Sequence, residues 1–194
     1  MGRAPEPANR LPGRVRAMTT KAPPVKLRDW RETDLPLLMD MRNNVALQAQ
    51  LLSVVRGSDE AAVRAWLTRR TEGPGRIFRV IAETGTNAPV GYLQADLADE
   101  RLDGWSFGIC LDERFQGAGY GTAVLIALER DLADKFGARH LKLEVDSSND
   151  KAIRCYRRLG YAEYGTVARE VTPGDAPRMV LSMAKQIDRQ EDHR

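Results

Sequence analysis

The chain has few of the residues that build metal centres and disulfide frameworks. Its 194 residues include two histidines and two cysteines. Neither histidine, His140 or His193, has a partner at metal-ligand spacing, so we expect no metal site. Two cysteines give no disulfide framework, which favours a reducing compartment, the cytoplasm. Cys110 and Cys155 both fall within predicted regular structure and are predicted to be small buried side chains.

Long apolar runs and a large charge excess are also lacking. No run is long enough to span a bilayer, so we expect no membrane partner. The net charge is +3, and residues 1–24 contribute +4 from five basic side chains and one acid. The rest of the chain is therefore near −1 and shows no basic patch for nucleic acid. We predict a disordered basic, proline-rich tail over 1–24, one domain over 25–186 and a charged C-terminal tail over 187–194.

Residues 107–122 combine an apolar run with a glycine-rich turn that opens a long amphipathic helix. Apolar residues then recur at helical spacing, at Val124, Leu128, Leu132 and Phe136. Glycines let backbone N–H groups approach a ligand, and a helix start adds unpaired donors with a partial positive charge. Such a turn is an anion site that suits a diphosphate.

The glycine spacing separates the classes of diphosphate ligand. A Walker loop needs a lysine after its last glycine, but Thr122 follows Gly121 directly. A dinucleotide fingerprint needs glycine or alanine where Thr122 stands. The spacing that the chain does contain is Gln-x-x-Gly-x-Gly, at Gln116, Gly119 and Gly121. The alternative is an ordinary glycine-rich turn before a core helix.

A second motif follows the helix. Residues 139–145 alternate as in a half-buried strand, and Asn149 then precedes a short helix over 151–159 that ends at Gly160. The block contains Asn149, Ala152, Tyr156, Gly160 and Tyr161 in the spacing Asn-x-x-Ala-x-x-x-Tyr-x-x-x-Gly-Tyr.

These two motifs, in this order, resemble the GNAT superfamily of N-acetyltransferases. The likeness covers roughly residues 25–186, with Tyr161 where phenylalanine is more usual. The opening of the domain, with Arg42-Asn43, is similar to the branch that includes ribosomal-protein, spermidine and nucleotide-sugar amine acetyltransferases.

The resemblance implies an α+β fold with a mixed, mostly antiparallel sheet, flanked by helices, in which a central parallel strand pair splays apart. Periodicity predicts a helix at 33–43 and a second helix after Ser58, which is its predicted cap, and shows no clear period over 45–57. Strands are predicted at 25–30, 76–83, 90–97, 105–112, 139–145, 161–172 and 178–185, with a charged hairpin loop at 99–104.

The resemblance further implies acetyl-CoA as co-substrate and no metal. Its pantetheine arm would pair with the strand backbone as an added strand does. The backbone contacts would come from Ile109, Cys110 and Leu111. The diphosphate would meet the turn formed by Gln116, Gly117, Ala118, Gly119, Tyr120, Gly121 and Thr122. Asn149 would contact the pantetheine, or would only cap the next helix.

Two residues are the catalytic candidates. Tyr156 would protonate the departing thiolate, because a phenol with a pKa of about 10 keeps its proton at neutral pH. Core packing is its alternative role. Glu144 would be the base that deprotonates the amine, or would face solvent or pair with neighbours such as Lys142 and Arg139.

The expected function is transfer of an acetyl group from acetyl-CoA to a primary amine of a small molecule, such as an amino sugar or a polyamine-like compound. The alternatives are acetylation of a protein N-terminus and a non-catalytic acyl-CoA-binding regulatory module. A homodimer is compatible with the resemblance. Because acceptor walls are built from loops, which vary freely, the sequence does not name the acceptor.

Overall fold

The computed structural model describes residues 23–187, except 56 and 100–103. Most of the two predicted tails, 1–24 and 187–194, lies outside the described residues, as does the centre of the predicted hairpin loop at 99–104. Ile187 is described and buried, and its N–H bonds to the carbonyl of Arg139 at 2.8 Å. Ile187 therefore packs against the start of β5 (His140–Asp146).

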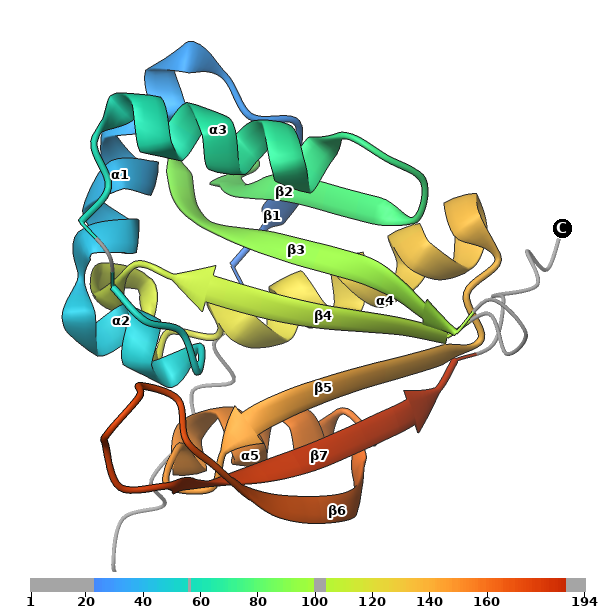
Figure 1. Cartoon of the computed structure of the whole chain (residues 1–194). Coiled ribbons are helices and arrows are strands. Elements are labelled where there is room, and N and C mark those ends of the chain that lie inside the picture. The colour runs from blue at the N-terminus through green and yellow to red at the C-terminus, as the bar shows by residue number, and fades with distance from the viewer. Residues whose placement is uncertain (1–22, 56, 100–103, 188–194) are drawn as a thin grey trace, which may run out of the picture.

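One seven-stranded sheet organises the fold (Figure 1). Its order is β1-β2-β3-β4-β5-β7-β6, with β4–β5 the parallel pair and every other pair antiparallel. The strands are β1 (Val25–Arg28), β2 (Arg76–Glu83), β3 (Pro89–Asp99), β4 (Gly104–Leu111), β5 (His140–Asp146), β6 (Ala162–Arg169) and β7 (Arg178–Gln186). This arrangement confirms the predicted α+β class.

Helices cover both faces of the sheet. They are α1 (Leu35–Asn43), α2 (Val45–Gln50), α3 (Glu60–Thr71), α4 (Tyr120–Phe136) and α5 (Asp150–Arg158). Alternation along the strands supplies two apolar cores. One core packs under α4 and α5, around residues such as Leu125, Leu128 and Leu141. The other packs under α1, α2 and α3, where Trp66, Phe78 and Tyr92 form a ring cluster.

Two details of the N-terminal half differ from the sequence expectation. Asp59, not Ser58, caps α3, accepting from the N–H of Ala62 at 2.8 Å. Ser58 is buried instead, because its N–H and carbonyl bond to the side chain of Asn43 at 2.6 and 2.8 Å. These bonds fix the loop that precedes α3 against the end of α1.

The segment 45–57, which has no clear period, contains the short helix α2. Asn44 caps it by accepting from the N–H of Leu47 at 3.0 Å. Its buried face includes a polar residue, Gln48, whose amide donates to the carbonyl of Met41 at 3.0 Å. Because a polar residue lies on the buried face of this six-residue helix, the sequence shows no clear apolar period there. The helix α2 lines one side of the site described below.

Candidate functional site

The parallel strands β4 and β5 separate soon after they meet. Their ladder has three pairs, Gly104 with His140, Trp105 with Leu141, and Ser106 with Lys142. Beyond these pairs β4 continues to Leu111 and β5 to Asp146 without bonding to each other (Figure 1). The sheet therefore contains a V-shaped gap, closed at Ser106–Lys142, and this confirms the predicted splayed pair.

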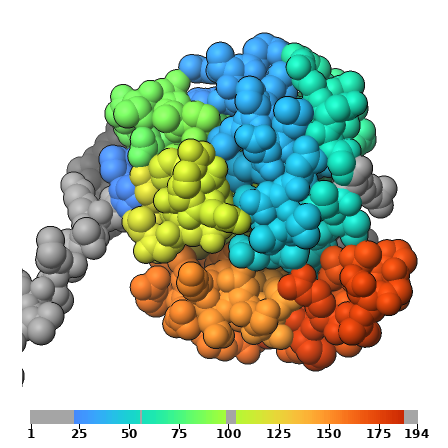
Figure 2. All heavy atoms as spheres, turned by 90° about the vertical axis from the view of Figure 1, so that its left-hand side faces the viewer, coloured from blue at the N-terminus to red at the C-terminus, as the bar shows by residue number. Residues whose placement is uncertain are grey.

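A cavity of about 1430 Å³ occupies this gap. Its walls come from α2, β4, the glycine-rich turn, β5, α5 and the β6–β7 region. Figure 2 shows the face where α2 in cyan and the turn in yellow meet the C-terminal elements in orange and red. Because residues from both faces of the sheet line the same space, the cavity passes through the sheet.

The turn after β4 is closed by a side chain and by glycine conformations. Gln116 donates its amide to the carbonyl of Leu111 at 3.0 Å. Gly117 and Gly119 have φ angles of 78° and 89°, a region that other residues rarely adopt. This explains the residue types of the Gln-x-x-Gly-x-Gly motif: the glutamine closes the turn, and the glycines permit its backbone path.

The turn leads into the N-terminus of the 17-residue helix α4. Gly119 is its N-cap and has no side chain that could accept from the N–H groups of the first turn. A β-carbon on Gly121 would lie 3.9 Å from Cys155 Sγ and Leu111 Cδ1, an ordinary contact. The uncapped donors and the helix dipole suit a diphosphate, and the residues present therefore fit the CoA moiety.

The other predicted cofactor residues divide into two groups. The cavity lining includes Ile109, Cys110, Leu111, Gln116, Gly117, Gly119, Gly121, Thr122 and Asn149. It does not include Ala118 or Tyr120. The Tyr120 hydroxyl donates to Glu83 Oε1 at 2.6 Å, which attaches the start of α4 to β2. These two residues can contribute only backbone groups.

The two cysteines have different surroundings. Cys110 is buried in the core under α1–α3, and burial raises the pKa of its thiol to about 12. That residue is the buried thiol that the sequence predicts. Cys155 corrects the prediction: it is only half-buried, it lines the cavity, and its Sγ lies 3.3 Å from Thr122 Oγ1. Its position on α5 places it beside the glycine-rich turn.

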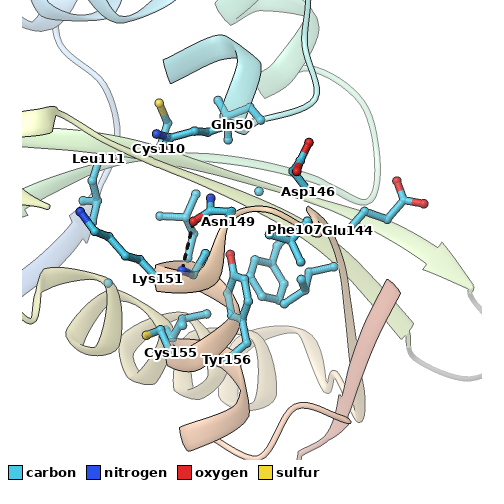
Figure 3. A pocket seen from close by; sticks show the side chains of 18 of the residues that line it. Gln50, Phe107, Cys110, Leu111, Glu144, Asp146, Asn149, Lys151, Cys155 and Tyr156 are labelled. Carbon is cyan, nitrogen blue, oxygen red and sulfur yellow. Dashed lines mark hydrogen bonds between the residues drawn. The ribbon is translucent and has the colours of Figure 1, made fainter. Parts of the chain in front are cut away.

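Asn149 caps α5, accepting from the N–H of Ala152 at 3.2 Å. Capping is thus observed, and contact with the pantetheine stays a prediction. Seven residues later, Tyr156 packs its ring edge-on against Phe107 and Tyr161, with centroids 6.4 and 5.8 Å away. Its hydroxyl points into the cavity in Figure 3. Burial raises the pKa of Tyr156 above its ordinary value, so the phenol stays protonated.

The candidate base Glu144 lies on β5 and makes an ion pair. Arg169 donates to both of its oxygens at 2.6 Å, and these bonds lower the pKa of the carboxyl. The partner is therefore Arg169 of β6, not the predicted neighbours Lys142 or Arg139. In Figure 3 the Glu144 carboxylate points away from Tyr156. Its role as base stays a prediction, and the ion pair weakens it as a proton acceptor.

Two more charged residues of the site were missed from the sequence. Asp146 is buried at the end of β5; burial opposes its charge, but bonds from Ser148 and the nearby Arg178 keep its pKa below the usual range. Arg178 Nε lies 2.6 Å from Asp146 Oδ2, and its Nη1 donates to the carbonyl of Ala49 at 2.7 Å. Strand alternation from Glu144 could have indicated Asp146, but no local signal indicates Arg178, which comes from β7.

A metal-ion cluster and a membrane-spanning helix are both absent from the described residues. No three His, Cys, Asp or Glu residues within 23–187, leaving aside 56 and 100–103, come together as a metal site. Over the same ranges, no helix has the length and apolar character needed to cross a membrane.

A mixed sheet that opens at its parallel pair, beside a glycine-rich helix start, is the architecture that the sequence resemblance implies for an N-acetyltransferase fold. The acetyltransferase (GNAT) family model matches residues 40–161. The chain belongs to this family.

The similarity to individual curated relatives is limited in sequence identity or in length. A mycothiol acetyltransferase of Nocardiopsis dassonvillei is 29% identical over 177 residues, covering 77% of this chain and 53% of that protein. Spermine/spermidine N(1)-acetyltransferase of Bacillus subtilis (strain 168) is 37% identical over 57 residues, 29% of this chain and 38% of that protein. The chain thus spans about half, or less, of the length of these curated relatives.

Solved structures show the same fold. A spermidine N-acetyltransferase from Vibrio cholerae, in complex with CoA and spermine, superposes with a TM-score of 0.76. The alignment covers 84% of this chain and 95% of that one at 15% identity. At this identity the likeness establishes the fold alone.

Proposed function

We propose that this protein transfers the acetyl group of acetyl-CoA to a primary amine of a small molecule, such as an amino sugar or a polyamine-like compound. One observation carries the proposal. A single cavity joins the glycine-rich turn, the Tyr156 hydroxyl and the polar face of β5 through the gap in the sheet. Relatives named mycothiol acetyltransferase and spermine/spermidine N(1)-acetyltransferase support a small-molecule acceptor.

Acetyl-CoA would be held mainly by backbone groups. Residues 109–111 of β4 border the gap and can pair with the pantetheine arm as an added strand does. The N–H groups of residues 117–121 would bind the diphosphate at the start of α4. Asn149, whose side chain lines the same cavity, would contact the pantetheine while it caps α5.

The transfer forms a C–N bond and breaks the thioester C–S bond, and the sulfur leaves as a thiolate that needs a proton. Tyr156 would supply this proton, because its phenol is protonated and reaches the cavity. The attacking amine must lose a proton. Glu144 is the residue candidate, although its pair with Arg169 lowers its basicity. Water in the open cavity is the alternative acceptor of that proton.

Two other functions need separate tests. Acetylation of a protein N-terminus would use the same cavity with a peptide acceptor. A non-catalytic acyl-CoA-binding module would bind the ligand without turnover. We also propose a cytoplasmic location, because both cysteines are free thiols. A homodimer stays a prediction.

The test is mass spectrometry of two pools, small amines and N-terminal peptides, each incubated with the full chain and acetyl-CoA. Acetylated small amines support the proposal. Transfer to peptides alone would favour N-terminal acetylation, and tight acetyl-CoA binding with no product in either pool would favour the regulatory module.

A further inference from the structure

The side chains of β5 divide between the two faces of the sheet. Leu141, Leu143 and Val145 are buried in the core under α4 and α5. Lys142, Glu144 and Asp146 alternate with them and therefore lie on the opposite face, toward α2. All three line the cavity. Since Tyr156 and the glycine-rich turn belong to the α4–α5 side, these charged residues border the end of the cavity where the amine would bind.

The carboxylates on this face are already neutralised by arginines. Glu144 receives two bonds from Arg169 at 2.6 Å. Asp146, which is buried, is paired with the half-buried Arg178 at 2.6 Å and also accepts a bond from the hydroxyl of the exposed Ser148. Further along, Asp96 of β3, which also lines the cavity, lies 3.2 Å from Arg70 of α3. A bound polycation would have to compete with an arginine for each of these carboxylates.

Lys142 is different. It is half-buried and lines the cavity, and among the described residues it has no hydrogen-bond or ion-pair partner. It also belongs to the last ladder pair, opposite Ser106, so its backbone marks the closed end of the V-shaped gap. An unpaired ammonium group at this point repels a second cation and attracts an anion.

We propose that the acceptor is a small amine that also carries an anionic group, a carboxylate or a phosphate, and that Lys142 binds this group. The inference rests on the acetyl transfer proposed above and narrows its acceptor. Lys142 acts as a specificity residue. Its charge-assisted hydrogen bond orients the acceptor so that the amine faces the gap. The apolar residues Leu47, Leu51 and Leu52, from α2 and the residues after it, also line the cavity.

The experiment uses acceptor pairs that differ by one anionic group. Lysine and cadaverine differ by a carboxylate, and glucosamine 6-phosphate and glucosamine differ by a phosphate. For each compound, kcat/KM with acetyl-CoA is measured, and affinity for the protein–CoA complex is measured by calorimetry. We expect at least one pair to favour the anionic member by about tenfold or more, the size of one charge-assisted bond. The two pairs separate a carboxylate from a phosphate as the recognised group.

Variants of Lys142 test whether this residue causes the preference for the anionic member of a pair. Lys142→Met keeps the apolar stem. In the pair that shows the preference, it should reduce the ratio of kcat/KM between the anionic member and its partner to about one. Lys142→Glu should invert it, and Lys142→Arg should restore it. Lys135→Gln, which removes an exposed lysine of α4 that pairs with Asp131, is the matched control and should keep the wild-type ratio. Circular dichroism on each variant separates loss of recognition from loss of folding.

The outcomes are distinguishable from failure of acetyl transfer itself. If cadaverine and glucosamine equal or exceed their anionic partners in both measurements, or if none of the four compounds binds, the inference is wrong although acetylation of other amines can stand. If no amine of any kind is acetylated but the anionic members bind with a Lys142-dependent preference, the anion site stands and the proposed reaction does not.

Discussion

Replacing Tyr156 with phenylalanine removes one oxygen atom from the lining of the cavity. The ring contacts with Phe107 and Tyr161 remain, because they involve the aromatic edges and not the hydroxyl. Within the described part of the chain, no residue hydrogen-bonds to that hydroxyl. We therefore expect the free energy of unfolding to change by less than about 0.5 kcal/mol, the range of substitutions that lose no contact.

The rate should change much more. A positioned general acid typically contributes about 10²–10⁴-fold. At about 1.36 kcal/mol for each factor of ten, this is roughly 2.7–5.4 kcal/mol of activation free energy. Because burial raises the pKa of Tyr156 above its ordinary value, the wild-type phenol keeps its proton through neutral and mildly alkaline solution. Its ionisation should therefore cause no loss of rate below about pH 10.

The assay follows release of the CoA thiol from acetyl-CoA, alongside calorimetry of acetyl-CoA binding and urea unfolding. Tyr156→Phe should lose turnover with affinity and unfolding midpoint unchanged. Tyr161→Phe is the matched control, since it removes a hydroxyl from the same ring cluster but outside the cavity lining. Full turnover in Tyr156→Phe, or an equal loss in Tyr161→Phe, would refute the assignment of the proton donor.

Three further predictions concern the turn, a buried ion pair and a close strand contact. Gly119→Asp should abolish acetyl-CoA binding in calorimetry, because it places a carboxylate at the proposed diphosphate site; Gly119→Ala shares the positive φ of 89° and controls for backbone strain. Asp34→Asn should cost about 3 kcal/mol in urea unfolding, because Asp34 is buried and bonds twice to Arg28, at 2.7 and 2.9 Å. The ion pair with Arg28 lowers the pKa of Asp34, so the stabilisation from this pair is present above about pH 4 and is lost as the pH falls. The free energy of unfolding of Asp34→Asn should therefore depend less on pH in acid than that of the wild type. An identical pH dependence in the two proteins would contradict this. Gly91→Ala should cost about 1–3 kcal/mol, since its Cβ would lie 2.2 Å from a backbone carbonyl of β4, whereas Gly85→Ala meets nothing within 4 Å and should cost little.

The parts of the fold that local patterns encode were predictable. The strand at 76–83 has the predicted bounds, because it is rich in apolar and β-branched residues and a Gly-Pro-Gly segment precedes it. The glycine-rich turn was predictable because the φ angles of Gly117 and Gly119 restrict the residue type. The helix α2 was not, since it is six residues long and buries Gln48.

The charged part of the site depends on long-range pairing that no local pattern contains. Glu144 and Arg169 are 25 residues apart, and Ala49 and Arg178 are 129 apart. Both pairs depend on the strand order in which β7 pairs with β5 and β6 pairs with β7. For this reason the sequence indicated Glu144 but not its partner, and it did not indicate Arg178 or the unpaired state of Lys142.

The gap between β4 and β5 also affects how the protein behaves without its ligand. Most proteins keep unpaired strand edges at the rim of a sheet and protect them there, because such edges can join a strand from another molecule. In this protein two unpaired edges lie in the middle of the sheet. If the pantetheine arm binds as proposed, it would occupy these edges, and CoA would then also protect the chain against strand exchange and self-association.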